Sequence, residues 1–244
     1  MSAIDGTLGR LQHFYRSGPL PCPYLPGRVE RKLFTRLNGG DAQALNTTLS
    51  QAGFRRSHDI VYRPVCPGCR ACVPVRIPVA TFVPSRTMRR TWAANTDLMA
   101  GTTPALATDE QFALFLRYQQ HRHGDSDMAR MSRLDYGSMI EEGSTGAALI
   151  EFRDGSDTLQ AAALVDVLED GLSAVYSFYD PDEPERSLGT YVILALVEEA
   201  RQRGLDHVYL GYWIAQSRKM AYKARFQPLE ALTDTGWAPL PPEA

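Results

Sequence analysis

The pattern of apolar and polar positions, read with its end signals, predicts five helices. Asp41 is a predicted N-cap and Gly53 lies just past the end of the first helix. Thr108 and Gln111 form the pattern of a capping box at the start of the third. The predicted helices cover residues 41–53, 84–98, 108–123, 188–204 and 217–226.

Apolar runs between these helices predict strands over residues 54–64, 74–79, 146–153, 159–169, 172–180 and 206–214. Asp154-Gly155 and Asp170-Gly171 are turn signals that separate three of them. The second half then has the order β-β-β-α-β-α, and a crossover helix of this kind predicts a mixed α/β sheet. The stretch 101–108 has the composition of a linker. We therefore expect an α/β (α+β) protein with an N-terminal domain over 1–103 and a C-terminal domain over 104–244.

Composition adds a charge asymmetry to this picture. The 244 residues carry a net charge of −2, yet residues 1–97 hold 14 Lys/Arg against 5 Asp/Glu, and the remainder 12 against 23. A basic half favours an anionic partner such as nucleic acid, and a solvated charged surface is the alternative. No apolar run is long enough to span a bilayer, and the first residues lack the apolar core of a signal peptide. Four cysteines without a secretory signal favour a reducing, cytoplasmic location.

Three of the four cysteines lie in one C-x-x-C-x-x-C stretch, as Cys66, Cys69 and Cys72. With Cys22 as a fourth ligand they could bind zinc or an iron–sulfur cluster. A structural zinc site usually draws its cysteines as two pairs, so buried thiols without a metal are the alternative.

Two strand ends carry candidate chemistry. The first ends at Tyr179 and Asp180, and the next helix opens at Ser187, Leu188 and Gly189. Free N–H groups at such a helix start can hold a phosphate or a developing oxyanion, whereas a plain N-cap at Ser187 is the alternative.

The second strand end carries Tyr212 and Trp213, which could stack on a base or line a pocket. The basic helix after it offers Lys219, Lys223 and Arg225 to a phosphate or a carboxylate, or simply to solvent. The chain has no P-loop and no G-x-S-x-G nucleophile elbow.

Several segments together resemble the aminoacyl-tRNA–protein transferases of the N-degron pathway, over roughly residues 10–230. The segments are CPYLPGRVERKLFTRL, LSQAGFRRSHDIVYRPVCPGCRACVPVRIPVATFVPSRTMRRTW, FYDPDEPERSLGTYVILALVEEA and YLGYWIAQSRKMAYKARFQP. The resemblance is to the bacterial aspartate/glutamate leucyltransferase branch, with the eukaryotic arginyltransferases as more distant relatives. It implies transfer of an aminoacyl group from a charged tRNA to a protein that begins with Asp or Glu. It also implies a core related to the GNAT acyltransferases, which the run at 159–213 fits.

The eukaryotic relatives are reported to bind a metal or cluster through paired cysteines. This chain keeps Cys22 but has Leu25 where those relatives have the second cysteine. A transferred metal site is therefore in question. Since an aminoacyl ester is already activated, the implied reaction needs neither ATP nor a redox cofactor.

For this reaction, the sequence suggests a set of roles. We expect Asp180 to orient or deprotonate the attacking amine, and Tyr212 and Gln216 to contact the reacting ester. The ester would also be lined by the helix start at Ser187, Leu188 and Gly189. Tyr179 and Trp213 are expected to bind the substrate or the tRNA. The tRNA phosphates would meet Arg86, Arg89 and Arg90. The acceptor carboxylate or the tRNA 3′ end would be read by Lys219 and Lys223, with Arg76 and either Arg55 or Arg56 as rival candidates.

Three other functions remain open from the residues. An arginyl-tRNA donor would use the same fold and chemistry. A GNAT acetyltransferase would bind acetyl-CoA at an R/Q-x-x-G-x-G/A loop, for which the chain offers only ERSLGT. A non-enzymatic metal-binding nucleic-acid module would use the cysteines and leave the acidic second half without a role.

Overall fold

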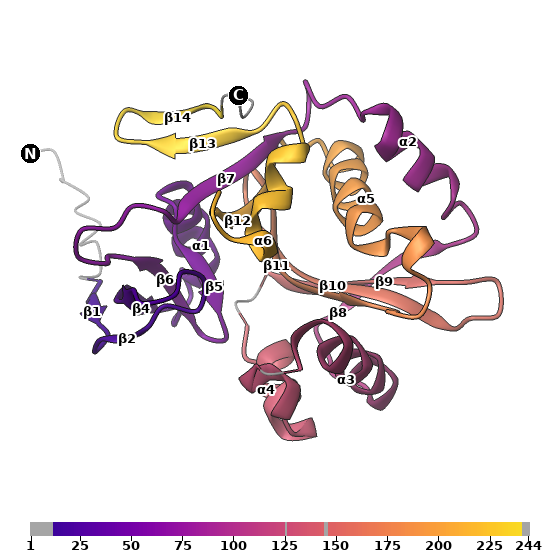
Figure 1. The fold of residues 1–244 in the computed structure, drawn as a ribbon, viewed down its shortest axis with the longest axis horizontal. Helices are drawn as coiled ribbons and strands as arrows, with labels where there is room; N and C mark the ends of the chain where they lie inside the picture. The colour runs from indigo at the N-terminus through magenta and orange to yellow at the C-terminus, as the bar shows by residue number, and fades with distance from the viewer. Residues whose placement is uncertain (1–11, 125, 144–145, 241–244) are drawn as a thin grey trace, which may run out of the picture.

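An eight-stranded mixed sheet forms the centre of the computed structural model, which describes residues 12–124, 126–143 and 146–240 (Figure 1). Its strand order is β14-β13-β7-β12-β11-β10-β9-β8. The strands are β7 (Val73–Pro78), β8 (Met99–Pro104), β9 (Ala147–Arg153), β10 (Leu159–Val167), β11 (Gly171–Tyr179), β12 (His207–Trp213), β13 (Glu230–Thr233) and β14 (Gly236–Pro239).

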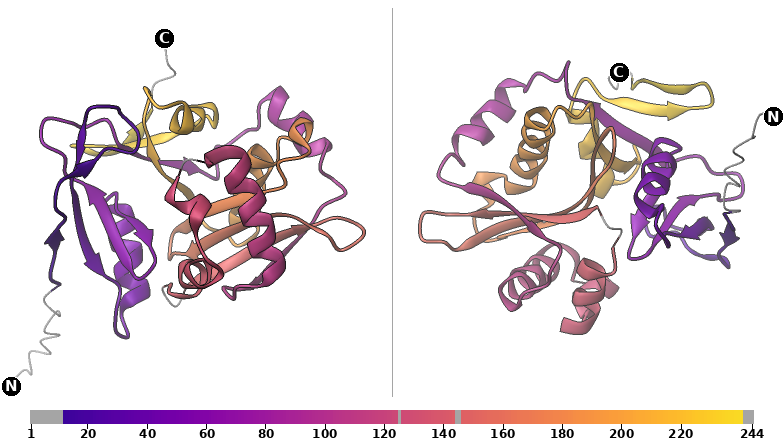
Figure 2. Two further views of the ribbon diagram at one scale, coloured as in Figure 1. Left: turned by 60° about the horizontal axis from the view of Figure 1, so that its bottom comes forward. Right: turned by 180° about the vertical axis from the view of Figure 1, so that it is seen from behind.

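Helices cover both faces of this sheet (Figures 1 and 2). One face carries α5 (Leu188–Gln202), with α2 (Arg86–Ala93) packed beside it. The other carries α3 (Asp109–His123) and α4 (Arg133–Glu141), with the short helix η1 (Asp127–Arg130) between them. The connections η2 (Pro184–Arg186), α6 (Arg218–Ala221) and η3 (Tyr222–Arg225) flank the ends of β11 and β12.

Strand β10 shows why two cores form. Its side chains alternate between the faces, because successive residues of a strand point in opposite directions. Ala161, Ala163 and Val165 join the core under α5, and Ala162 and Leu164 join the core under α3. A continuous apolar run is therefore required, and small alanines let both helix layers approach the sheet closely.

The N-terminal part forms two small sheets beside the central one. The first has the order β1-β4-β6-β5, from Tyr15–Arg16, Lys32–Arg36, Ile60–Pro64 and Arg55–Ser57, and the second pairs β2 (Leu20–Pro21) with β3 (Val29–Glu30). Helix α1 (Ala42–Gln51) packs against β5. A buried ion pair between Arg56 and Asp166 joins this part to β10, and Asn46 of α1 donates to the same carboxylate.

Strands β11 and β12 are parallel neighbours over only three positions, which end at Ser173 and Tyr209. Beyond them β11 stays paired with β10, whereas β12 follows β7 through a register shift between Tyr209 and Gly211. The two strands therefore diverge toward their carboxyl ends. In open α/β sheets this is the place where ligands bind.

Most predicted elements are confirmed, including the helices at α1, α2, α3 and α5, the capping box at Thr108, and the mixed sheet. The linker at 101–108 is wrong in part, because β8 runs through it as an exposed edge strand without apolar alternation. The single strand at 54–64 is two strands, which turn at His58 with φ of 55°. Strands β7 and β8 lie in the central sheet, and the domain boundary at 103/104 stays a prediction. Across the described ranges, no helix is long and apolar enough to cross a membrane.

Candidate active site

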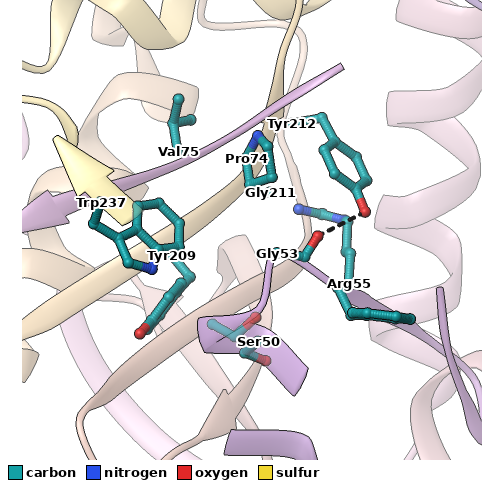
Figure 3. Close-up of a pocket in the computed structure, with 11 residues that line it drawn as sticks. Ser50, Gly53, Arg55, Pro74, Val75, Tyr209, Gly211, Tyr212 and Trp237 are labelled. Carbon is teal, nitrogen blue, oxygen red and sulfur yellow. Dashed lines mark hydrogen bonds between the residues drawn. The ribbon is translucent and has the colours of Figure 1, made fainter. Parts of the chain in front are cut away.

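Arg55 lies in the opening between β11 and β12. Its guanidinium donates to the carbonyl oxygen of Leu210 on β12 at 3.2 Å, and to that of Val175 on β11. These carbonyls belong to the diverging part of the strands, where β11 and β12 no longer bond to each other. The side chain from the small N-terminal sheet thus fills the opening of the central one (Figure 3).

Gly211 makes room for this guanidinium. A Cβ atom built there would lie 1.7 Å from Nη1 of Arg55, and the φ of +71° is one that other residues rarely adopt. The small cavity beside it is lined by Gly53, Pro74, Ser173, Tyr209, Tyr212 and Trp237, and Figure 3 shows Arg55 reaching into it. The bulge at Gly211 is therefore part of the site.

Lys223 is the second cation of the site and is 5% exposed. Its Nζ donates to the carbonyl oxygen of Tyr212 at 2.6 Å and lies 3.8 Å from the sulfur of Met220. Burial lowers the pKa of Lys223 well below its ordinary value, and the charge of Arg55 lowers this pKa further. Neither Arg55 nor Lys223 forms an ion pair with a carboxylate of the described residues.

The charge of Arg55 affects the pKa of four tyrosine phenols, and this group of four residues is called the tyrosine ring. They are Tyr24, Tyr176, Tyr212 and Tyr222. Burial raises the pKa of each phenol, to about 12 for Tyr24 and Tyr176, and Arg55 acts in the opposite direction. The hydroxyl of Tyr212 lies 3.0 Å from the carbonyl oxygens of both Gly53 and Tyr62 and donates to one at a time. All four phenols are therefore neutral hydrogen-bonding groups at physiological pH.

At the carboxyl end of β11, Tyr179 and Asp180 meet helix α3. Asp180 pairs with Arg117, which also lies 3.4 Å from Asp182, and its Oδ1 accepts from the backbone N–H of Asp182 at 3.0 Å. The hydrogen bond to Asp180 raises the pKa of Arg117. The carboxylate is thereby held in one orientation and balanced by a cation.

Tyr179 lies under a second arginine of α3. Arg122 donates to its hydroxyl at 2.8 Å, and the ring of Tyr118 packs edge-on at 4.8 Å. Gly189, at the start of α5, lies so close that a Cβ there would be 2.9 Å from the Tyr179 ring. The predicted residues Tyr179 and Gly189 are therefore in direct contact.

The start of α5 has an unusual backbone. Ser187 adopts a left-handed conformation with φ of 52°, and its side chain makes no capping hydrogen bond. Its carbonyl accepts from Thr190 and Tyr191 instead. The N–H groups of Leu188 and Gly189 have no partner among the residues described, while the side chain of Leu188 is buried in the core. Residues held in this region of φ/ψ space cluster at functional sites.

The loop before α5 is tied to the segment that follows the basic helix α2. Arg186 donates to the side-chain oxygen of Asn95 at 2.9 Å and pairs with Asp97, and Asn95 donates back to the carbonyl of Arg186 at 2.8 Å. Arg86, Arg89 and Arg90 are exposed on α2, and none of them pairs with a carboxylate in the described part of the chain.

Other predicted residues lie outside this constellation. Arg76 pairs with Glu230 at 2.7 Å and donates to Tyr209, so its charge is balanced. Arg56 is balanced by Asp166. Gln216 and Lys219 are exposed and make no side-chain hydrogen bond among the described residues. Trp213 packs against the main core.

The four cysteines gather near one another without forming a ligand set. Burial raises the pKa of the Cys72 thiol to about 12, and Cys22, Cys66 and Cys69 raise it as well. Cys66 is engaged with the backbone of Arg31, whose N–H lies 3.4 Å from its sulfur. Within the described ranges, no three Cys, His, Asp or Glu side chains are placed to hold a metal ion. The described side chains therefore offer no ready set of metal ligands, and zinc or cluster binding stays a prediction.

A cavity of about 630 Å³ opens beside these cysteines. Cys66, Cys69 and Cys72 line one side of it, and Leu232 to Asp234 of the β13 end line another. Tyr212 and Gly53 border both this cavity and the small one at Arg55. A volume in this range accommodates a ligand of small-molecule size.

Sequence reasoning missed the contribution of α3 and of the β12 glycine. Arg117 and Arg122 come from a predicted helix, and only the fold shows that they meet β11. Gly211 did leave a signal, because a glycine inside a strand pattern marks a bulge or a close backbone approach.

The amino-acid sequence of the chain is similar to that of a known protein family. Residues 20–90 match the N-terminal domain of arginine-tRNA-protein transferase, and residues 110–233 match its C-terminal domain. The chain is 57% identical to the aspartate/glutamate leucyltransferase of Paramagnetospirillum magneticum over 94% of each chain. It is 55% identical to that of Granulibacter bethesdensis, over 96% of this chain and 87% of the other.

The fold has a wider relationship. The C-terminal domain of a putative lysylphosphatidylglycerol synthetase from Agrobacterium fabrum superimposes with a TM-score of 0.50 at 14% identity, over 79% of this chain and 66% of that one. The architecture is mixed α/β, like that of this domain, with a small N-terminal sheet beside the central one, as expected from the sequence. The chain belongs to the arginine-tRNA-protein transferase family of aminoacyltransferases, as one of its aspartate/glutamate leucyltransferases.

Proposed function

We propose that this protein transfers leucine from Leu-tRNA to the α-amine of proteins that begin with Asp or Glu, which marks them for degradation in the N-degron pathway. The observation that carries the proposal is the 57% identity, over 94% of both chains, to a protein named aspartate/glutamate leucyltransferase. An arginyl-tRNA donor is the alternative within the same family.

The reaction is aminolysis of an ester. The amine attacks the aminoacyl carbonyl, a tetrahedral intermediate forms, and the tRNA 3′-oxygen leaves with a proton. An α-amino group has a pKa of about 7.7–8.0, so a useful fraction is neutral near pH 7. The enzyme therefore needs to position the amine, accept its proton and stabilise the oxyanion.

Asp180 serves to orient the attacking amine. Its pairing with Arg117 and with the N–H of Asp182 supports this role over that of a free base, because both oxygens are already held. A carboxylate has about four acceptor positions, so it can accept a further hydrogen bond from an ammonium or amine.

The start of α5 faces the same end of β11 and serves the ester carbonyl. The unpartnered N–H groups of Leu188 and Gly189, in the described part of the chain, support their use as oxyanion donors. The left-handed backbone at Ser187 supports it too, because it breaks the side-chain cap that would otherwise occupy a donor.

The basic face of α2 contacts tRNA phosphates. Its three exposed arginines lie on the helix directly before the segment that holds the loop in front of α5. A tRNA bound at α2 would thus be close to the residues that position its ester. The chemistry draws only on the activated ester, so no cofactor is required, and the cysteines are assigned a structural part.

The decisive experiment offers radiolabelled Leu-tRNA or Arg-tRNA, with peptides that begin with Asp, Glu, Asn or Ala. We expect leucine on the Asp and Glu peptides and none on the others. Arginine transfer in place of leucine would favour the alternative donor, and no transfer from either tRNA would reject the proposal.

Substitution of Asp180 tests its role. Misplacing a reacting group by about 1 Å can cost about 100-fold in rate, so Asp180→Asn is expected to lower the transfer rate by about 100-fold. Asp182→Asn, which changes the more exposed acid beside Arg117, is the control and is expected to retain most activity. Wild-type rates in a folded Asp180→Asn protein would remove Asp180 from the mechanism.

A further inference from the structure

Arg55 and Lys223 both donate to backbone carbonyls of strand β12. Arg55 donates to the carbonyl of Leu210 and Lys223 to that of Tyr212. These carbonyls are two residues, or about 7 Å of strand, apart on β12. Two cations from sequence positions 168 residues apart therefore meet where β11 and β12 diverge.

Both cations have donors to spare. A guanidinium carries five N–H groups, and Arg55 donates to only two backbone carbonyls among the described residues. An ammonium carries three, and Lys223 has one strong acceptor and a weak thioether contact. Arg55 is half-buried and thus reachable from solvent, whereas Lys223 is buried.

No acid of the described residues balances this positive charge. Nearby arginines differ, because Arg56, Arg76 and Arg117 each have a carboxylate within 3.4 Å. Burying a cation without a counter-ion is costly, and two such cations repel each other. The effect of Arg55 on the pKa of Lys223 is a sign of that repulsion. An incoming anion would relieve both costs.

We infer that Arg55 and Lys223 form the subsite that binds the side-chain carboxylate of the acceptor's N-terminal Asp or Glu. The inference rests on the proposed function. The guanidinium presents a planar fork that matches a carboxylate, and Tyr212 lines the same small cavity. An Asn or Gln side chain has the same shape but no charge, so it would leave both cations unbalanced.

A phosphate of the tRNA fits this place less well. Arg55 lies between β11 and β12 and is bonded to a carbonyl of each strand, which suits a flat group on a slim peptide end. The exposed arginines of α2, in contrast, can follow a phosphate backbone.

The test compares Asp-peptide and Asn-peptide in two measurements on the full chain. Calorimetric titration without tRNA measures peptide binding alone, and leucine transfer gives kcat and KM for peptide and for Leu-tRNA. The variants are Arg55→Gln and Lys223→Met, with Arg36→Gln as a matched control that also removes one positive charge from the N-terminal sheet. Arg36 is exposed and pairs with Asp59 at 3.3 Å.

We expect Arg55→Gln and Lys223→Met to raise the KM for the Asp-peptide by at least about thirtyfold, since losing one partner of a buried charge pair costs about 2 kcal/mol or more. The preference for Asp over Asn should fall by the same factor. The KM for Leu-tRNA should stay within about twofold, and Arg36→Gln should behave as wild type. Lys223→Met keeps the test valid if Arg55→Gln does not fold.

Two results would overturn the subsite. One is an undiminished Asp-over-Asn preference in a folded variant, and the other is a loss that falls on the KM for Leu-tRNA instead. Failure of the wild type to transfer leucine would reject the proposed function, while the titration would still show whether the subsite selects the carboxylate.

Discussion

Two adjacent arginines on β5, Arg55 and Arg56, differ in whether a carboxylate balances their charge. Arg56 turns toward the central sheet, where Asp166 accepts from its Nε at 2.8 Å through both oxygens, and both side chains are almost fully buried. Arg55 turns to the other face, as alternation in a strand requires, and enters the β11–β12 opening, with no acid partner among the described residues. The comparison shows that charge compensation, more than burial, separates a structural arginine from a candidate binding one.

The largest effect is expected where the charge is compensated. Arg56→Met leaves Asp166 buried and unpaired, which costs about 3–5 kcal/mol of unfolding free energy. Asn46 would remain the partner of that carboxylate from α1. Urea denaturation measures the loss.

The paired change Arg56→Met with Asp166→Leu is the control for this prediction. Because it removes both charges, it should recover most of the lost stability. A double variant as unstable as the single one would show that packing, and not the ion pair, joins the N-terminal sheet to β10.

Lys223 should show the reverse behaviour. Lys223→Met removes a buried cation that has no counter-ion among the described residues, and we expect a gain on the order of 1 kcal/mol near pH 7. The loss of the hydrogen bond to the Tyr212 carbonyl limits the gain. A variant that is more stable but binds the Asp-peptide more weakly would sharpen the contrast with Arg56, whose loss is expected to destabilise the fold.

The pH dependence of that gain has a definite sign. The folded-state pKa of Lys223 is depressed, so between that pKa and the ordinary lysine value the unfolded chain binds more protons than the folded one. The destabilising effect of Lys223 is therefore full below its folded pKa and fades as the pH rises toward its ordinary value. The stability difference between Lys223→Met and wild type should shrink as the pH rises toward the ordinary lysine pKa of about 10.4, and a difference that stays constant up to that pH would contradict the depressed pKa.

The arginines of α2 also lack a carboxylate partner among the described residues, but they are exposed, so water solvates their charge. Each Arg→Ala change at Arg86, Arg89 or Arg90 should weaken tRNA binding by about threefold near physiological salt. It should also lower the slope of log affinity against log salt by roughly one. Filter binding across a salt series measures both quantities, and an unchanged slope would remove α2 from the tRNA interface.

The sequence predicted most helices and strands correctly, but it did not predict which charged side chains pair with one another. Apolar periodicity marked α3, α5 and β9 to β12, because each buries a regular face. It gave no signal for β8, an exposed edge, and α4 and the β13–β14 hairpin went unrecognised. Lys223 and Tyr212 were candidates because they follow a strand end. Arg55 could not be separated from Arg56, since the partners that distinguish them lie 110 to 155 positions away in the chain.

The smallest effect is expected for an ion pair that is compensated but exposed. Arg70 and Asp234 are 3.1 Å apart, with side chains 88% and 91% exposed. Exposed pairs contribute about 0–1 kcal/mol, so Arg70→Gln should change the unfolding free energy by less than about 0.5 kcal/mol. Measured beside Arg56→Met under the same conditions, Arg70→Gln shows how much less an exposed ion pair contributes to the unfolding free energy than a buried one. A loss near that of Arg56→Met would mean that the hairpin β13–β14 depends on this contact, and that exposure does not rank these pairs.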